Sequence, residues 1–296
     1  MSTTPDTKHP QGAPKVGLRE LVRMKSEGEK IVMITAYDYP SGRHADAAGV
    51  DVVLVGDSAA MTVLGHDSTV PITLDEMVML AQATVRGAKR PLVIADLPFG
   101  SYQVSDEEAA RSAIRMAKDA GVDMIKIEGA GQTVSRLRAI VGAGVAVCAH
   151  LGLTPQSATL LGGYRAQARS AEEALQAVRD ALELEAAGAS MLVLEAVPPI
   201  VAGRITEAVS IPTIGIGAGA QCDGQVLVYH DAVGISTGPR PRFVRQYASA
   251  GEDITQALAT YTAEVKSGAY PQPEHEYTMP PDELGRFEAA QHLSVT

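Results

Sequence analysis

Four short apolar runs in this chain each end in an acidic residue. The first three acids are separated by about one unit of strand and returning helix, roughly 30 residues or more, and the fourth by about two such units. Because parallel strands of a barrel present their carboxyl ends at one rim, we expect these four carboxylates to converge in space. The four runs are VVLVGD ending at Asp57, LVIAD at Asp96, MIKIE at Glu128 and MLVLE at Glu195.

The chemistry that such a cluster favours is metal binding. Carboxylates crowded together repel one another unless a cation or a proton lies between them. Oxygen ligands at strand ends suit Mg²⁺, which keeps part of its water shell and leaves positions for a chelating substrate. We therefore predict Asp57 and Asp96 as ligands, with Glu128 bound directly or through water. The alternative is that strand-end acids cap the next helices or pair with Lys and Arg.

Two further residues are candidates for catalysis. Lys126 and Glu128 alternate on one strand and face the barrel interior, where an ammonium needs a carboxylate or an anionic ligand beside it. We predict that Lys126 binds a substrate carboxylate and offsets charge as an enolate forms, a role compatible with an internal ion pair to Glu128. Glu195 lies apart from the other acids, next to Ala196 and Val197, and is a candidate general base. The alternative for Glu195 is a salt bridge at the rim.

Weaker signals come from histidines near strand ends. His150 in AHLGL ends a predicted strand and could hydrogen-bond a substrate oxygen, or it is a core histidine with satisfied partners. His230 and Asp231 adjoin the last predicted strand, and they need not act together because adjacent strand residues face opposite sides.

Predicted strands and helices alternate along the chain. Alternation of this kind indicates a parallel sheet, and eight units favour a closed (β/α)8 TIM barrel over an open doubly wound sheet. The first helix is expected to close one end of the barrel. The predicted strands are 31–36, 52–56, 92–95, 124–128, 145–149, 191–195, 212–216 and 225–228, and the predicted helices are 18–27, 41–48, 74–86, 106–120, 133–141, 171–187, 200–209 and 242–266.

This pattern divides the chain into three parts. We expect a disordered N-terminal tail over 1–16, a barrel catalytic domain over 17–268 and a Pro-rich acidic tail over 269–296. The second tail carries prolines at 271, 273, 280 and 281, so it cannot add a core strand and is expected to cover the surface or a neighbouring subunit.

Composition excludes several classes of partner. The formal net charge of −10 disfavours nucleic acid, and no cluster of Lys and Arg is interleaved with aromatics. No stretch approaches the roughly 18 apolar residues of a membrane span, and the first residues lack a signal-peptide core. The two cysteines, Cys148 and Cys222, are too few for a disulfide framework. We expect a cytoplasmic protein with reduced thiols.

Several longer motifs, in their order and their spacing, resemble those of the ketopantoate hydroxymethyltransferase (3-methyl-2-oxobutanoate hydroxymethyltransferase) family. The resemblance extends from about residue 17 to 271. The motifs are ITAYD at 34–38, VGDS at 55–58, DSTVPITLDEM at 67–77, ADLPFGSY at 95–102, KIEGA at 126–130, AHLGLTPQS at 149–157, LEAVP at 194–198, and IPTIGIGAG with CDGQVLVYHD within 211–231.

The resemblance implies a fold like that of the phosphoenolpyruvate mutase and isocitrate lyase group and a homodecamer of two pentameric rings. It implies transfer of a hydroxymethyl group from 5,10-methylenetetrahydrofolate to 3-methyl-2-oxobutanoate, giving 2-dehydropantoate, the first committed step of pantothenate synthesis. The carried-over roles are Mg²⁺ on Asp57, Asp96 and Glu128, oxo-acid binding by Asp57, Ser58, Asp96 and Lys126, and proton acceptance by Glu195.

Two alternatives to this function stay open on the sequence. One is a magnesium-dependent lyase or mutase of the related barrel group, acting on a 2-oxo or phosphono acid without folate. The other is a non-catalytic scaffold that keeps the barrel, against which the intact set of acids argues. No basic patch is obvious for the glutamate tail of a folate, so the sequence does not show how that co-substrate is held.

Overall fold

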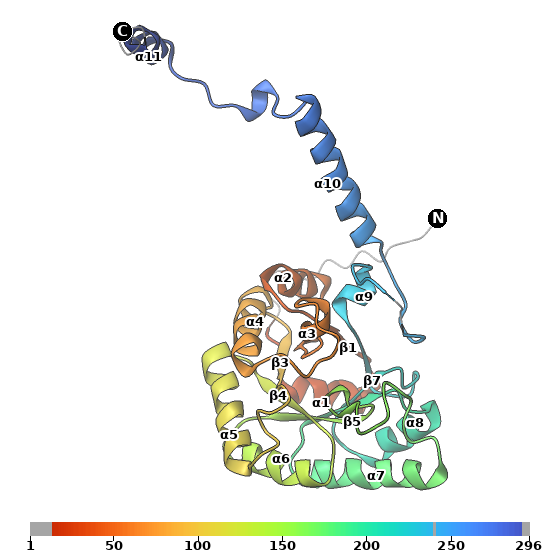
Figure 1. Cartoon of the computed structure of the whole chain (residues 1–296). Helices are drawn as coiled ribbons and strands as arrows, with labels where there is room; N and C mark the ends of the chain where they lie inside the picture. The colour runs from red at the N-terminus through yellow and green to blue at the C-terminus, as the bar shows by residue number, and fades with distance from the viewer. Residues whose placement is uncertain (1–13, 239–240, 292–296) are drawn as a thin grey trace. The chain divides into compact units, whose positions relative to one another are not determined.

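The computed structural model describes residues 14–238 and 241–291. Within these ranges eight parallel strands form a closed barrel in chain order, and β8 pairs with β1 to complete it (Figure 1). The predicted (β/α)8 architecture is therefore confirmed. The strands are β1 Ile31–Thr35, β2 Val52–Val55, β3 Leu92–Asp96, β4 Met124–Glu128, β5 Val147–Gly152, β6 Met191–Glu195, β7 Thr213–Ile216 and β8 Gly224–Leu227.

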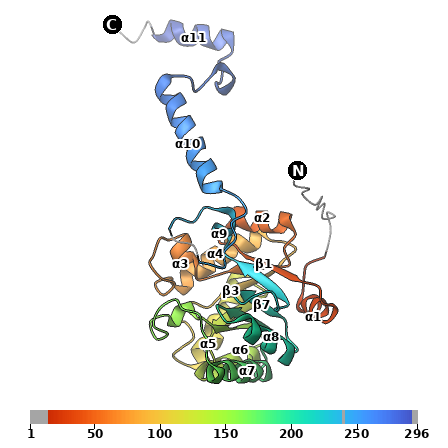
Figure 2. The same cartoon turned by 90° about the vertical axis from the view of Figure 1, so that its right-hand side faces the viewer.

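Helices follow most strands and surround the barrel (Figures 1 and 2). Two of these helices begin with a side-chain cap: the Thr73 and Ser105 side chains accept hydrogen bonds from backbone N–H groups in the first turn of the helices that they precede. The helices before β8 are α1 Leu18–Glu27, α2 Tyr39–Ala48, α3 Ala59–Thr62, α4 Leu74–Gly87, α5 Asp106–Arg115 with a π-helical turn Met116–Ala120, α6 Gln132–Gly142, α7 Ala171–Ala186 and α8 Pro199–Ala208.

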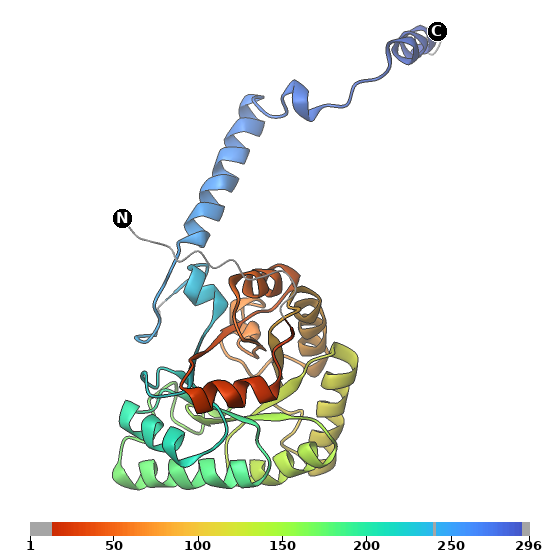
Figure 3. The same cartoon turned by 180° about the vertical axis from the view of Figure 1, so that it is seen from behind.

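Helix α1 lies across one end of the barrel, as predicted (Figure 3). Its side chains Leu21 and Met24 are buried in one apolar cluster with Ile31 and Met33 of β1 and with interior residues of the other strands. This cluster fills the amino-terminal half of the barrel, so the barrel is a packed core with chemistry possible only at the other end.

The alternation of side chains along each strand decides what reaches the interior. On β3, Leu92 and Ile94 belong to the interior cluster, whereas Val93 and Ala95 belong to the larger cluster between strands and helices. The next interior position after Ile94 is Asp96. The same rule places Lys126 and Glu128 above Met124 on β4 and His150 above Cys148 on β5, so the barrel changes from apolar to ionisable side chains along its axis.

The end of the barrel domain differs from the prediction. The helix predicted over 242–266 is wrong at its start, because α10 covers Ala250–Ser267. The preceding segment is held by tertiary contacts that the helical pattern does not reveal: the Tyr247 N–H donates to the Ala232 carbonyl, and the Phe243 ring packs against Gly217. A short helix that was not predicted, α9 Tyr229–Val233, follows β8.

Contacts divide the chain into two compact units, one ending at Ala248 and one beginning at Ser249. The second unit contains α10, a 3-10 turn Pro273–His275 and α11 Pro281–Gln291, a helix that was not predicted in the Pro-rich segment. The domain limits predicted at residues 16 and 268 stay predictions, and most of the expected N-terminal tail lies outside the described residues. None of the described helices is long and apolar enough to cross a membrane.

The fold predicts that both cysteines are unreactive in the native protein. Cys148 and Cys222 are fully buried, and burial raises the pKa of both thiols, that of Cys148 to about 12. We expect negligible reaction with a chromogenic disulfide reagent at mildly alkaline pH and rapid reaction of both thiols in guanidinium chloride. Rapid labelling of Cys148 in the native protein would contradict the packed interior.

Candidate active site

A buried ammonium lies at the centre of the ionisable layer. Lys126 Nζ is 3.0 Å from Asp96 Oδ1, 3.8 Å from Glu128 Oε1 and 3.3 Å from His150 Nδ1. Burial alone would lower the pKa of Lys126, but the charges of Asp96, Glu128 and Asp57 outweigh it and raise that pKa. The side chain is therefore a permanent cation. Its nearest partner is Asp96 and not Glu128, the partner considered from the sequence.

Asp57 follows β2 and approaches this group from the neighbouring strand. Its N–H donates to Asp96 Oδ2 at 2.9 Å, and its Oδ2 accepts from Gln156 Nε2 at 2.9 Å. Burial, followed by the charges of Asp96 and Glu128, raises the pKa of Asp57 well above its usual range. A carboxyl of this kind gains most from a nearby cation, because a cation favours its ionised form.

His150 joins Glu128 and Glu195. Its Nδ1 is 3.3 Å from Glu128 Oε1, and its Nε2 is 3.2 Å from Glu195 Oε2. Burial and the charge of Lys126 lower the pKa of His150, but the two carboxylates outweigh them and raise it to about 9. Contact with His150 and Lys126 in turn outweighs burial and lowers the pKa of Glu128. The imidazole is thus a bridge between the predicted ligand set and the predicted base.

Glu195 is held by an unusual backbone at the end of β6. The next residue, Ala196, has φ of 49°, a left-handed conformation that costs a non-glycine residue free energy. Its N–H donates to Ile216 and its carbonyl accepts from Gln167, which fix this turn. The side chain of Glu195 is 16% exposed, so it faces both His150 and the mouth of the barrel.

The structure also shows residues that sequence reasoning missed. Gln156 is buried in the turn after β5, where its N–H donates to Glu128 Oε2 at 3.0 Å in addition to its contact with Asp57. The Tyr102 hydroxyl donates to Gln156 Oε1 at 2.8 Å and accepts from the Glu128 N–H at 3.1 Å. The motifs ADLPFGSY and AHLGLTPQS contain both residues, but no pattern within them indicates that they fold back onto the acids. Ser58 has a further partner, because its Oγ is 2.9 Å from the Tyr37 hydroxyl.

The predicted ligand set fits Mg²⁺ by its chemistry. Within the described part of the chain, the buried oxygens Asp96 Oδ1 and Glu128 Oε1 have no aligned hydrogen-bond donor, although Lys126 lies close to both and His150 close to the second. Buried polar atoms without such partners are costly and are expected to meet a ligand. Among the described residues, no group of three acidic, His or Cys side chains is already arranged around a metal position. The metal ligands therefore stay a prediction.

Comparison with known proteins decides the family. A family model described as ketopantoate hydroxymethyltransferase matches residues 15–273. The chain belongs to this family. It is 52% identical over 263 residues to the 3-methyl-2-oxobutanoate hydroxymethyltransferase of Moorella thermoacetica, covering 89% of this chain and 98% of the relative. It is 49% identical over 275 residues to the enzyme of that name in Heliobacterium modesticaldum. This alignment covers 93% of this chain and 100% of the relative.

Solved structures confirm the predicted fold group. A 2,3-dimethylmalate lyase described as a PEP mutase/isocitrate lyase superfamily member aligns with a TM-score of 0.55 at 19% identity, over 93% of this chain and 98% of that one. A phosphonopyruvate hydrolase in complex with oxalate and Mg²⁺ aligns with a TM-score of 0.56 at 11% identity. This alignment covers 93% of this chain and 96% of the hydrolase. At these identities the likeness concerns the fold.

The backbone around Glu195 gives a prediction about Gly152. This glycine has φ of +94°, and a Cβ added to it would lie 2.1 Å from the Glu195 carbonyl oxygen. We expect Gly152→Ala to lower the free energy of unfolding by about 2 to 4 kcal/mol, because both the conformation and the contact oppose a side chain. Denaturant unfolding of Gly152→Ala and of Gly142→Ala measures this. Gly142 lies in α6 with no atom near its added Cβ, so its variant should be as stable as the wild type or more so. Equal stability of the two variants would contradict the close approach.

The charge cluster gives a prediction about Lys126. We expect Lys126→Met to lower the free energy of unfolding by about 3 to 5 kcal/mol, because it leaves buried carboxylates without their cation. Mg²⁺ should raise the melting temperature of this variant more than that of the wild type. The control is Lys118→Met at an exposed lysine, where a change within about 0.5 kcal/mol is expected. An effect of Lys126→Met no larger than the control would show that the ammonium does not stabilise the acids.

Proposed function

We propose that this protein transfers a hydroxymethyl group from 5,10-methylenetetrahydrofolate to 3-methyl-2-oxobutanoate, giving 2-dehydropantoate and tetrahydrofolate for pantothenate synthesis. The observation that carries the proposal is a buried cluster of carboxylates and one ammonium with Glu195 beside it. The sequence of this chain is 49% and 52% identical to those of two relatives named 3-methyl-2-oxobutanoate hydroxymethyltransferase. Acids and an ammonium are the groups that a proton abstraction next to a carbonyl needs.

We assign Asp57, Asp96 and Glu128 as the residues that hold Mg²⁺. All three are buried and carry oxygen donors, the ligands that this hard cation prefers. When bound, Mg²⁺ withdraws charge from the keto oxygen of the substrate and so makes the proton on C3 more acidic. The raised pKa of Asp57 implies that binding of the cation displaces a proton from this carboxyl or prevents its uptake.

The remaining steps belong to side chains of this protein. We assign the Lys126 ammonium and the Ser58 hydroxyl to hold the carboxylate of the oxo acid, and Lys126 to offset negative charge as the enolate forms. The contacts of Lys126 with Asp96 and of Ser58 with Tyr37 support this assignment, because they bring both groups to the predicted site. Glu195 takes the C3 proton, and its Oε2 lies 3.2 Å from His150 Nε2, close enough for the imidazole to influence its charge. C3 then forms a bond to the methylene carbon of the co-substrate, whose two bonds to the folate nitrogens break. One water molecule supplies the hydroxyl group of the product, and its other proton and the proton from C3 end on the two nitrogens of tetrahydrofolate.

The second candidate function is that of a lyase or mutase of the same fold group. It is favoured only by the structural neighbours, one of which is a 2,3-dimethylmalate lyase at 19% identity. Such an enzyme would cleave a carbon–carbon or carbon–phosphorus bond and would not need a folate. The far higher identity to hydroxymethyltransferases argues for the first function.

We also propose that the protein works as a homo-oligomer, a decamer by its resemblance to the family. Helix α10 supports association, because it carries four apolar side chains at spacings of four, three and four residues, and the described residues of its own unit bury none of them. A seam of this kind is typical of helices that pack on another helix. The four residues are Ile254, Leu258, Tyr261 and Val265.

The test is proton NMR of 3-methyl-2-oxobutanoate in deuterium oxide with protein and Mg²⁺, before and after 5,10-methylenetetrahydrofolate is added. We expect loss of the C3 proton signal without folate, and 2-dehydropantoate once the folate is present. Glu195→Gln should slow both by about 10² to 10⁴-fold, because it removes a general base. Glu172→Gln, at an exposed position on α7, should change neither.

Each outcome of this test bears on one part of the proposal. Full exchange by Glu195→Gln would reject Glu195 as the base. Exchange without product would reject the folate reaction, and cleavage of an oxo acid without folate would support the lyase. Absence of exchange and product in the wild type would reject the function as a whole.

A further inference from the structure

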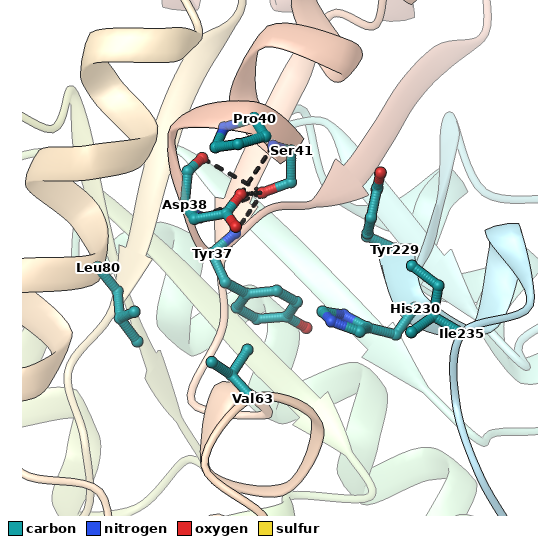
Figure 4. Close-up of a pocket in the computed structure, with 9 residues that line it drawn as sticks. All are labelled: Tyr37, Asp38, Pro40, Ser41, Val63, Leu80, Tyr229, His230 and Ile235. Atoms are coloured by element: carbon teal, nitrogen blue, oxygen red, sulfur yellow. Dashed lines mark hydrogen bonds between the residues drawn. The ribbon is translucent and has the colours of Figure 1, made fainter. Parts of the chain in front are cut away.

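A cavity lies beside the predicted oxo-acid site. Its volume is about 240 Å³, and it is enclosed by the start of α2, the end of α3, α4 and the region of α9 (Figure 4). The residues that line the cavity include Tyr37, Asp38, Val63, Leu80, Tyr229 and His230. None of them belongs to the predicted metal or oxo-acid set, so the reaction of C3 with Glu195 leaves this cavity without a role.

The Tyr37 side chain connects the cavity to the predicted oxo-acid site. The Tyr37 ring lines the cavity, while its hydroxyl is 2.9 Å from Ser58 Oγ. Ser58 is the predicted substrate-binding neighbour of Asp57, and both Ser58 Oγ and Asp96 Oδ2 lie within 4 Å of a Cβ built on Gly56. A molecule in the cavity is therefore one residue away from the group that holds the oxo acid.

The lining favours an uncharged aromatic group. The Tyr37 and His230 rings lie 5.3 Å apart between centroids at 47°, with the apolar side chains of Val63 and Leu80 also on the wall (Figure 4). His230 Nδ1 is buried and has no hydrogen-bond partner among the residues that the structure describes. Burial lowers the pKa of His230, so the imidazole is neutral at pH 7 and free to bond a ring nitrogen.

The charge of the lining excludes the oxo acid as the occupant. Asp38 is the charged residue among the described residues that line the cavity, and no Lys or Arg is among them. Its Oδ1 accepts from the Ser41 N–H at 2.7 Å, which fixes the carboxylate at the entrance to α2. A carboxylate anion would be repelled there, whereas a heterocycle with amino and N–H donors would be attracted.

We propose that this cavity receives the pterin ring of the one-carbon donor, next to the oxo acid on Ser58 and Lys126. The volume suits a two-ring fragment and is below the roughly 300 Å³ at which sites for whole drug-sized ligands begin. The aminobenzoyl-glutamate part therefore stays outside the cavity. The inference deepens the proposed function and rests on it, since a lyase would have no use for a pterin.

The experiment fills the cavity without touching the acids. Val63 is 44% exposed, so Val63→Phe can enlarge a side chain on the wall with little strain on the core. We expect Val63→Phe to raise the KM for 5,10-methylenetetrahydrofolate by about tenfold or more, while C3 proton exchange without folate and the KM for the oxo acid stay as in the wild type. Val104→Phe, at a 74% exposed position that does not line the cavity, is the matched control and should change none of these.

A second variant tests the polar contact. We expect His230→Leu to raise the folate KM, and calorimetry should show weaker binding of tetrahydrofolate to both variants in the presence of Mg²⁺ and oxo acid. If both variants kept the wild-type KM for 5,10-methylenetetrahydrofolate and the wild-type affinity for tetrahydrofolate, the proposed pterin site would be rejected. The proposed function would not be affected by that result. A raised KM for the oxo acid alone would also reject the pterin site, because the cavity would then hold the isopropyl group. No exchange and no product in the wild type would instead reject the proposed function.

Discussion

A single buried ammonium surrounded by carboxylates is the constraint on which this active end of the barrel depends. Four acids cannot share a water-poor space unless cations or protons offset their charge. Lys126 supplies one positive charge, and His150, whose pKa is raised to about 9, supplies another. The pKa of Asp57 is also raised, well above its usual range, and for a carboxyl this favours the neutral form. In the proposed mechanism, a metal cation bound to this cluster takes the place of a proton on Asp57.

The apolar amino-terminal half of the barrel supports this arrangement of charges. The interior cluster of Leu, Ile, Val and Met side chains, closed by α1, removes water from one side of the ionisable layer. Charges in such a setting interact strongly, so the positions of Asp96 and Lys126 must be fixed by the strands themselves. Gln156 and Tyr102 also hold the acids in place, because their hydrogen bonds connect the loop after β5 to Glu128 and Asp57.

Much of this could be predicted from the sequence because it follows from the period of a strand. An acid that follows an apolar run at an interior position must reach the rim, and the proximity of Asp96, Lys126 and Glu128 required no other information. The failures have a common cause. The late start of α10, the short helix α9 and the role of Gln156 all depend on contacts between segments distant in sequence, which local patterns do not record. The cavity beside Tyr37 is missed for the same reason, because its walls come from α2, α3, α4 and α9.

The most direct test of the central claim is a crystal structure of the protein with Mg²⁺ and 3-methyl-2-oxobutanoate. The account predicts the ion on Asp57 and Asp96, the carboxylate of the oxo acid within reach of Lys126 Nζ, and C3 facing Glu195. An ion bound elsewhere, or an oxo acid whose C3 points away from Glu195, would contradict it.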